Sequence, residues 1–337
     1  MSRFTKITEN LFESVVKAVL LVAGLILFLT GVFMTFHANA SIKLDNFDDL
    51  WNLGEPVVIE TEFRKLLPQA ESLKNKSIYL QILSQIALTQ ALQKRFDDAH
   101  KTLNNAEALL TPEYELAHVR ILLERGRVFQ QAAKIPEARV CLEQSFELST
   151  KHNFDFHTIN AAHMIAIVAS TTTEKITWNQ RALDLAAKTQ DQRAQNWLGS
   201  LYNNLGQNYL EAKQFEKALA VFQKALECRE KEDYAPNIRY AKWSVARALR
   251  SLGRLDEALT IQNAVLKDYD AITKSSKFDM PVEMFTLTRG LVYEELAEIY
   301  TAKAKVFSNL AYDDLSNNVM FKETTPERLE RLKQLKN

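Results

Sequence analysis

The chain has 337 residues, of which 47% are hydrophobic and 25% charged, a composition typical of a globular protein and not of a disordered one. Its 42 basic and 42 acidic side chains cancel, so no overall positive charge attracts nucleic acid, and we expect no nucleic-acid partner. Only 8 glycines and 7 prolines occur, which predicts long helices with few tight turns and an all-α fold.

An apolar segment near the N-terminus predicts that the rest of the chain is exported. Residues 18–36 form an uncharged run of 19, with basic residues before it and Ala38-Asn39-Ala40 after it. The small side chains of Ala38 and Ala40 suit signal-peptide cleavage after Ala40, whereas the length of the run approaches the roughly 20 residues of a membrane-spanning helix. Residues 1–40 are therefore either a cleaved signal, giving a periplasmic protein, or an inner-membrane anchor with the remaining chain outside the cytoplasm.

Residues 41–76 are predicted to be an extension that ends in an N-terminal capping helix. The segment from Ser41 to Glu60 carries one lysine against five acidic residues, which fits its export. From Thr61 to Leu73, apolar residues recur at helical spacing and supply one buried face. This helix would cover the first repeat of the array described next.

The stretch YNNLGQNYLEAKQFEKALAVFQKAL, residues 202–226, has the spacing of a helix-turn-helix hairpin. Gly206 and Ala218 are small where the two helices would approach most closely, while Tyr202, Tyr209 and Phe222 fill the volume beside them. The start of the second helix recurs along the chain as FDDA (96–99), IPEA (135–138), TEKI (173–176), FEKA (215–218) and LDEA (255–258). Anchored on the last residue of each motif, the steps are 39, 38, 42 and 40 residues, with Lys175 competing with Ile176 for the third anchor.

These residues resemble a tetratricopeptide repeat, whose pattern is W-x-x-L-G-x-x-Y followed by A-x-x-x-F. The resemblance implies a right-handed superhelical solenoid of helix-turn-helix hairpins over residues 77–322, with five clear repeats, a degenerate sixth and capping helices. The period near 40 is similar to the long-period arrays of kinesin light chains. The expected first helices are 80–93, 119–132, 157–170, 199–212 and 239–252.

The sixth hairpin is expected to begin at Gly290, after a linker from Lys274 to Pro281. Tyr293, Leu296, Ala297 and Tyr300 match its first helix, and Ala304, Ser308 and Ala311 are assigned to a second helix after a shortened turn. Residues 323–337 are predicted to form a C-terminal capping helix, because TTPE at 324–327 has a capping-box arrangement.

The sequence contains no pattern typical of a catalytic, metal-binding or cofactor-binding site. His152, Asp155, His157 and His163 cluster in the sequence, but their spacing does not place the imidazoles on one helical face, so we expect no metal site. We find no nucleophile with an oriented base and no phosphate-binding glycine loop, and therefore expect no enzyme and no cofactor. Cys141 and Cys228 fall two repeats apart, too far to form a disulfide.

The resemblance implies a partner-binding groove lined by positions 2, 5, 9 and 12 of the first helices. Arginine and amide groups bind a carboxylate or main chain, and aromatic residues supply apolar anchors, so the predicted guest is another protein through an acidic or extended peptide segment. The sixth hairpin presents Leu291, Glu294 and Glu298 instead. The predicted groove residues are Arg120, Arg127, Gln130, Asn203, Gln207, Tyr240, Trp243, Arg247 and Arg250.

Other interpretations of these residues remain open at this point. The arginines can instead pair with acids of the neighbouring repeat, and Trp243 can pack between hairpins. The favoured function is a non-enzymatic interaction scaffold in the cell envelope. The alternatives are an envelope ligand sensor, an enzyme that uses the array to bind substrate, and a structural protein that associates with itself through its apolar ends.

Overall fold

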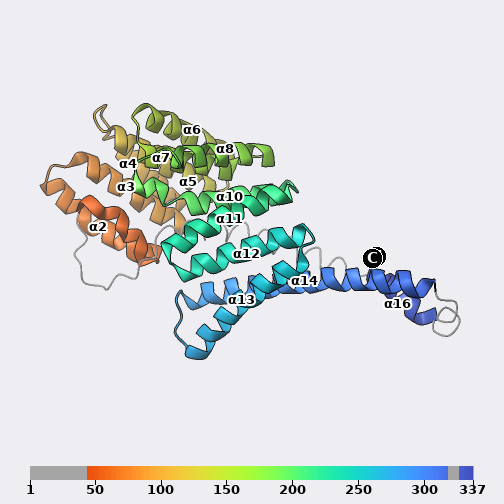
Figure 1. Cartoon of the computed structure of the whole chain (residues 1–337). Coiled ribbons are helices and arrows are strands. Elements are labelled where there is room, and N and C mark those ends of the chain that lie inside the picture. Colours follow the sequence, from red (N-terminus) through yellow and green to blue (C-terminus); the bar gives the residue numbers. More distant parts are fainter. Residues whose placement is uncertain (1–43, 318–325, 337) are drawn as a thin grey trace. The chain divides into compact units, whose positions relative to one another are not determined.

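The computed structural model describes residues 44–317 and 326–336, and all of its elements are helices (Figure 1). The chain divides into two compact units, Met1–Leu205 and Gly206–Asn337, which we describe separately as unit 1 and unit 2. The apolar run 18–36 and the predicted cleavage site after Ala40 lie outside the described residues. Within the described ranges, no helix combines the length and apolarity needed to cross a membrane.

Unit 1 begins with a short 3-10 segment and continues as antiparallel helix pairs, in which each first helix packs against the second helix that follows it. The predicted first helices are confirmed to within about five residues at each end. The elements are η1 (Leu44–Leu53), α2 (Pro56–Ser72), α3 (Lys76–Leu92), α4 (Phe96–Glu107), α5 (Glu115–Gln131), α6 (Ile135–Lys151), α7 (Asp155–Val168), α8 (Thr172–Ala186), α9 (Gln192–Gln195) and the first part of α10 (Leu198–Glu211).

Unit 2 begins within α10 and contains the same alternation of first and second helices. Helix α12 packs against both α11 and α13, and α13 packs against α14. The described part of the C-terminal helix, Pro326–Lys336, lies within the predicted range 323–337 and packs back on α14. The further elements are α11 (Phe215–Glu232), α12 (Ala235–Ser251), α13 (Leu255–Ser275), α14 (Val282–Ser316) and α16 (Pro326–Lys336).

Small residues lie where the two helices of a hairpin approach each other, as the sequence predicts. A Cβ atom added to Gly126 would lie 2.6 Å from the Leu142 side chain, and one added to Gly206 would overlap the Phe222 ring. The motif alanines Ala138 and Ala218 are fully buried. Each close approach lets a large apolar residue of the second helix fill the space over the small one.

The hairpin turns differ from the expectation that few glycines mean few tight turns. Each of the turns after α3, α5 and α10 places a non-glycine residue in the left-handed region, with φ of 62° at Lys94, 58° at Ala133 and 57° at Lys213. The next residue then donates its N–H back to the helix, as from Lys134 to the Phe129 carbonyl at 2.8 Å. This is the Schellman arrangement, which here forms without glycine at the strained position.

The prediction of a separate second helix in the sixth hairpin is wrong. Helix α14 runs without interruption from Val282 to Ser316, through Ala304 and Ser308, which were predicted to lie on a second helix after a shortened turn. The segment contains no proline and no glycine after Gly290, so nothing in it stops a helix. The residues assigned to two helices therefore lie within one helix of 35 residues, which begins before Gly290.

The third anchor is Lys175, not Ile176. In the other hairpins the anchor is the fourth residue of the second helix, and α8 starts at Thr172. The buried residues of α8 include Asn179, Ala182 and Ala186, which lie 4, 7 and 11 residues after Lys175. Ala258 is followed at the same intervals by three buried residues of α13. The two steps around the third repeat are therefore 37 and 43 residues, and its first helix is shifted by one position.

Candidate functional site

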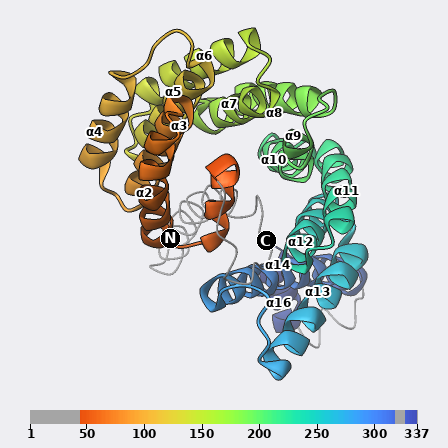
Figure 2. The ribbon, with the colours of Figure 1, turned by 90° about the vertical axis from the view of Figure 1, so that its left-hand side faces the viewer.

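The face of unit 1 formed by α3 and α5 carries the segment that precedes the array. Figure 2 shows η1 beside α3, on the side that faces away from α4. Leu44, Phe47 and Leu50 are buried there and belong to one apolar cluster with residues of α2 and α3. The indole N–H of Trp51 donates to Oε1 of Gln85 on α3 at 2.9 Å. The first-helix face of unit 1 thus holds a peptide segment supplied by the chain itself.

The main polar contact of η1 is an ion pair between Asp48 and Arg120 of α5. The guanidinium donates through Nη1 to Oδ2 at 2.8 Å and through Nη2 to Oδ1 at 2.5 Å. Its plane also lies over the Phe47 ring, with 4.9 Å between Cζ and the ring centre. Burial alone would raise the pKa of Asp48, but the charge and hydrogen bonds of Arg120 outweigh it and hold that pKa below its usual value. This bidentate geometry is the one in which arginine selects a carboxylate.

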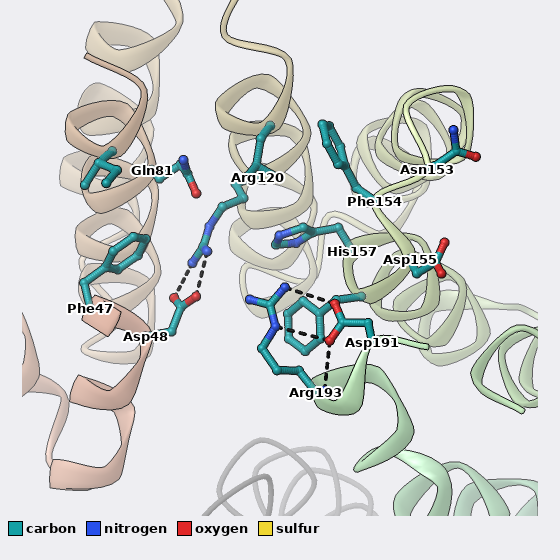
Figure 3. A pocket seen from close by; sticks show the side chains of 13 residues that line it. Phe47, Asp48, Gln81, Arg120, Asn153, Phe154, Asp155, His157, Asp191 and Arg193 are labelled. Atoms are coloured by element: carbon teal, nitrogen blue, oxygen red, sulfur yellow. Dashed lines mark hydrogen bonds and ion pairs between the residues drawn. The ribbon is translucent and has the colours of Figure 1, made fainter. Parts of the chain in front are cut away.

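A pocket of about 430 Å³ lies between η1 and the start of α7 (Figure 3). Asp48 and Arg120 form one side of it, and His157 and Arg193 lie on the opposite side. Its lining residues are Phe47, Asp48, Ile78, Gln81, Leu116, Arg120, Asn153, Phe154, Asp155, Phe156, His157, Asp191 and Arg193.

The polar groups of the pocket differ in how fully they are paired. Arg193 is paired with Asp191 at 3.0 Å, and Asp155 accepts a hydrogen bond from Thr189 at 2.5 Å. By contrast, Nδ1 of His157 has no hydrogen-bond partner within the residues that the structure describes, and the same holds for Nε of Arg120. Burial, followed by the positive charge of Arg120, lowers the pKa of His157 to about 3, so the imidazole is neutral at physiological pH.

His157 was missed as a pocket residue because of the register error in the third repeat. With the anchor at Ile176, position 2 of the third first helix falls on Thr158, but with the anchor at Lys175 it falls on His157. Position 2 of the first three repeats is then Gln81, Arg120 and His157, and all three line the pocket. The set is recognised only once the start and the buried residues of α8 fix the anchor at Lys175.

The predicted groove residue Arg127 belongs to a buried polar network that crosses three first helices. It donates to both Glu124 oxygens at 3.0 Å and to Oδ1 of Asn160 on α7 at 2.6 Å. Glu124 also accepts from Nε2 of Gln85 at 3.1 Å. Since Gln85 binds Trp51, the network reaches from α7 through α5 and α3 to η1. Of the other predicted residues in unit 1, Gln130 is half-buried at the end of α5 and Asn203 is buried on α10.

In unit 2 the predicted groove residues contact one another and α14. Trp243 is buried, stacks on Tyr240 with ring centres 5.2 Å apart, and donates to the Leu291 carbonyl at 3.1 Å. Arg247 lies 4.6 Å over the Trp243 ring and donates to Oε1 of Gln207 at 2.8 Å. The tryptophan therefore packs between hairpins, which was one of the alternatives left open by the sequence.

Arg250 pairs with the next hairpin of unit 2. It donates to the two oxygens of Glu295 on α14 at 2.5 and 3.1 Å, and Glu298 lies 3.9 Å away. Burial raises the pKa of Glu295 despite this partner. Arg239 forms a similar pair with Asp279 at 2.8 Å, in the loop before α14. These arginines connect consecutive hairpins of their own unit.

The clustered histidines do not come together as a metal site. His152 lies 2.8 Å from a Glu115 carboxylate oxygen, whereas His157 and His163 are buried in α7. Asn204 lies 3.4 Å from Nδ1 of His163, whose pKa burial lowers to about 4. Over the described ranges, no three His, Cys, Asp or Glu side chains are grouped so that they could hold a metal ion. Cys141 and Cys228 are both free thiols.

Comparisons with known proteins agree with this architecture. Residues 197–271 match the family model described as Tetratricopeptide repeat. A search of curated proteins gave no match. Among solved structures, BtubC (BKLC) from P. vanneervenii is 13% identical, with a TM-score of 0.55 over 64% of this chain and 91% of that chain. The apo form of RapI is 13% identical, with a TM-score of 0.55 over 86% of this chain and 96% of that one.

A putative kinesin light chain from Podosopora anserina is 17% identical, with a TM-score of 0.48 over 60% of this chain and 98% of that one. At these identities a structural likeness concerns the fold alone. Together with the family match, the likenesses to BtubC and RapI establish the architecture. The chain carries tetratricopeptide repeats in residues 197–271 and is built from the stacked antiparallel helix pairs of a tetratricopeptide-like solenoid.

Proposed function

We propose that the protein is a non-enzymatic interaction scaffold whose unit 1 binds an acidic segment of a partner protein on the first-helix face of α3 and α5. The observation that carries the proposal is the position of η1 on this face, with Asp48 held by Arg120. The pair recognises carboxylate geometry, and Phe47 and Trp51 beside it are the kind of aromatic anchor that dominates peptide interfaces. A partner segment of the same chemistry can make the same contacts once η1 has left.

We also propose that the scaffold acts in the cell envelope. The support is the apolar run 18–36, its basic N-terminal flank and the small residues Ala38 and Ala40. Cleavage after Ala40 would leave a periplasmic protein, and retention would leave an inner-membrane anchor. Immunoblotting of fractionated cells separates the two, because only cleavage shortens the protein and releases it from the membrane fraction.

The binding proposal is tested by titrating a labelled peptide with the η1 sequence, LDNFDDLWNL, into the full chain. The chain carries Asp48→Ala and Trp51→Ala, which weaken its own segment and leave the face available. We expect saturable binding that weakens with salt, because the main contact is an ion pair near the surface. Adding Arg120→Met to this chain should weaken binding at least tenfold, about 1.4 kcal/mol.

The matched control is Arg250→Met in the same background, because Arg250 also holds a carboxylate but lies in unit 2. It should leave the peptide affinity unchanged. Circular dichroism of each variant checks that the helices persist. Equal binding by the Arg120→Met chain, or the absence of binding by every chain, would contradict the proposal.

The pocket favours a second candidate function, the sensing of a small polar ligand. Its support is the pair of buried groups, Nε of Arg120 and Nδ1 of His157, that lack hydrogen-bond partners in the described part of the chain. A ligand with a hydrogen-bond acceptor would satisfy Arg120. Thermal-shift screening of small carboxylic acids and amides against wild type and His157→Phe tests this function, which requires a stabilisation that the variant loses.

A further inference from the structure

Helix α14 carries a second apolar stripe on the side that faces away from its own core. Its buried side packs through residues such as Phe285, Val292 and Ile299. On the exposed side, six residues recur at intervals of 3, 4, 3, 4 and 3, the spacing of a coiled-coil seam. We call them the α14 stripe: Gly290, Tyr293, Ala297, Tyr300, Ala304 and Phe307, all exposed.

Contacts among the described residues leave the stripe largely uncovered, although Arg289 lies 6.0 Å from the Tyr293 ring centre and Lys303 lies 6.0 Å from the Phe307 ring centre. The three aromatic side chains keep 48%, 54% and 62% of their surface exposed at Tyr293, Tyr300 and Phe307, even with α16 packed on α14. A Cβ atom added to Gly290 would meet no atom within 4 Å. Glycine inside a helix is destabilising relative to alanine, so a glycine that its own fold does not need suggests the close approach of another molecule.

The stripe alternates small and large residues in an order that is complementary to itself. If a second α14 lies antiparallel, Phe307 of one copy covers Gly290 of the other, Tyr293 covers Ala304, and Tyr300 covers Ala297. One register satisfies all of these pairs, with the two-fold axis between Ala297 and Tyr300. We infer that the protein forms a symmetric dimer through antiparallel pairing of the α14 stripes, with each aromatic ring in the space above a small residue.

The charges beside the stripe favour the same orientation. Glu294 and Lys305 flank it on one side of the helix, and both are exposed. Antiparallel pairing about this axis brings the same flank of the two helices together, and so places Glu294 of one copy close to Lys305 of the other. Opposite charges at flanking positions are a common determinant of helix orientation in coiled coils.

The rings of the stripe supply a large part of the surface that a stable dimer needs. A two-fold interface would contain six half-exposed rings, and an aromatic side chain buries about 150–250 Å² in full, so the rings contribute roughly 450–750 Å². Specific interfaces need about 1,000 Å², so the rings alone supply roughly half to three quarters of that area. The inference does not depend on the proposed function, because the stripe lies in unit 2 and the η1 face in unit 1.

Sedimentation equilibrium of the full chain in density-matched detergent tests the dimer. We expect a concentration-dependent monomer–dimer equilibrium for wild type. Ala297→Leu, which fills a space, and Tyr300→Ser, which removes a ring, should each raise the dimer dissociation constant at least tenfold. Val306→Ser is the matched control, since Val306 is an exposed apolar residue of α14 outside the stripe. A wild type that stays monomeric, or variants that dimerise as well as wild type, would overturn the inference.

A second measurement tests the register and the choice of a second copy as the occupant. A photo-cross-linking amino acid at Tyr300, in a mixture of isotopically light and heavy chains, should form light–heavy cross-links to the peptide that contains Ala297. Cross-links only within one chain, or to a different protein, would overturn the inference. Glu294→Lys should weaken the dimer and Glu294→Lys with Lys305→Glu should restore it, which a purely structural role within one chain does not predict.

Discussion

Arg120 in unit 1 and Arg250 in unit 2 both lie on first helices and both hold a carboxylate, but the carboxylates belong to different kinds of segment. Asp48 lies on a short segment that precedes the array, and Arg120 is a principal polar contact of that segment. Glu295 lies on α14, the next helix of the same unit, which also packs through an apolar cluster. Arginine–carboxylate pairing therefore holds a separable, ligand-like segment in unit 1 and joins consecutive hairpins in unit 2.

The two carboxylates also respond differently to their surroundings. The pKa of Asp48 is lowered because Arg120 outweighs the burial of the carboxyl group, whereas the pKa of Glu295 is raised because its burial outweighs Arg250. A lowered carboxyl pKa contributes stability above its unfolded value, and a raised one costs stability there. At neutral pH the Asp48–Arg120 pair is therefore favourable, whereas the burial of Glu295 costs more than its pairing with Arg250 returns.

The largest expected difference comes from breaking the buried network of unit 1. Glu124→Ala leaves the Arg127 guanidinium without its carboxylate and should cost about 3–5 kcal/mol of unfolding free energy. Glu295→Ala in unit 2 should cost less, about 1–2 kcal/mol, because Arg250 keeps 27% of its side chain exposed and can be hydrated. Denaturation followed by circular dichroism measures both, and an equal cost would contradict the difference between the units.

Acidification should destabilise unit 1 through its buried histidines. Burial lowers the pKa of His157 to about 3 and that of His163 to about 4, so below pH 6.5 only the unfolded chain gains their protons. Each histidine then removes about 1.4 kcal/mol of stability per pH unit until its folded pKa is reached. Glu295 acts in the opposite direction, since protonation relieves the cost of its burial.

Denaturation at a series of pH values measures this effect. The double variant His157→Gln with His163→Gln removes both groups and should flatten the stability profile between pH 6.5 and 4. The matched control is His118→Gln, because His118 is only partly buried on α5. A profile equally steep in the double variant would show that the acid sensitivity arises elsewhere.

The smallest expected effects concern two equivalent turns, one in each unit. Ala133 in unit 1 has φ of 58°, and Gly253 in unit 2 has φ of 74° with no atom near an added Cβ. Ala133→Gly should stabilise the protein by about 1 kcal/mol and Gly253→Ala should destabilise it by about 1 kcal/mol, because the left-handed region penalises a Cβ atom. Thermal unfolding measures both, and the same sign for the two changes would contradict the shared turn geometry.

The helical array could be predicted because its signals are local and repeated. Motif alanines such as Ala138 and Ala218 mark the fourth residue of second helices, and spacing then gives the first helices. Where the motif is weak, the predicted register is wrong by a single residue, as at Lys175. That error is enough to assign Thr158, and not His157, to position 2 of the third repeat. Tertiary packing of α8 decides that register, and the motif alone does not contain it.

The position of η1 on the first-helix face could not be predicted from the repeat pattern, because η1 precedes the repeats. Leu44, Phe47 and Leu50 recur every third residue, and this apolar spacing could have identified the segment, although the backbone kinks at Asn46 and the 3-10 helix is not continuous. Its position against Arg120 depends on a contact 72 residues away in the sequence. Likewise, the exposed side of α14 becomes informative only once the helix is known to be continuous.

Hydrogen exchange of residues 44–53 tests most directly the central claim that Arg120 holds η1 on the first-helix face of unit 1. The measurement compares the wild-type chain with Arg120→Met and with Arg250→Met. We expect Arg120→Met to speed exchange in this segment at least tenfold while the amides of α3 and α5 stay protected, and Arg250→Met to leave the segment unchanged. Unchanged exchange in the Arg120→Met chain would contradict the claim, and so would equal acceleration in both variants.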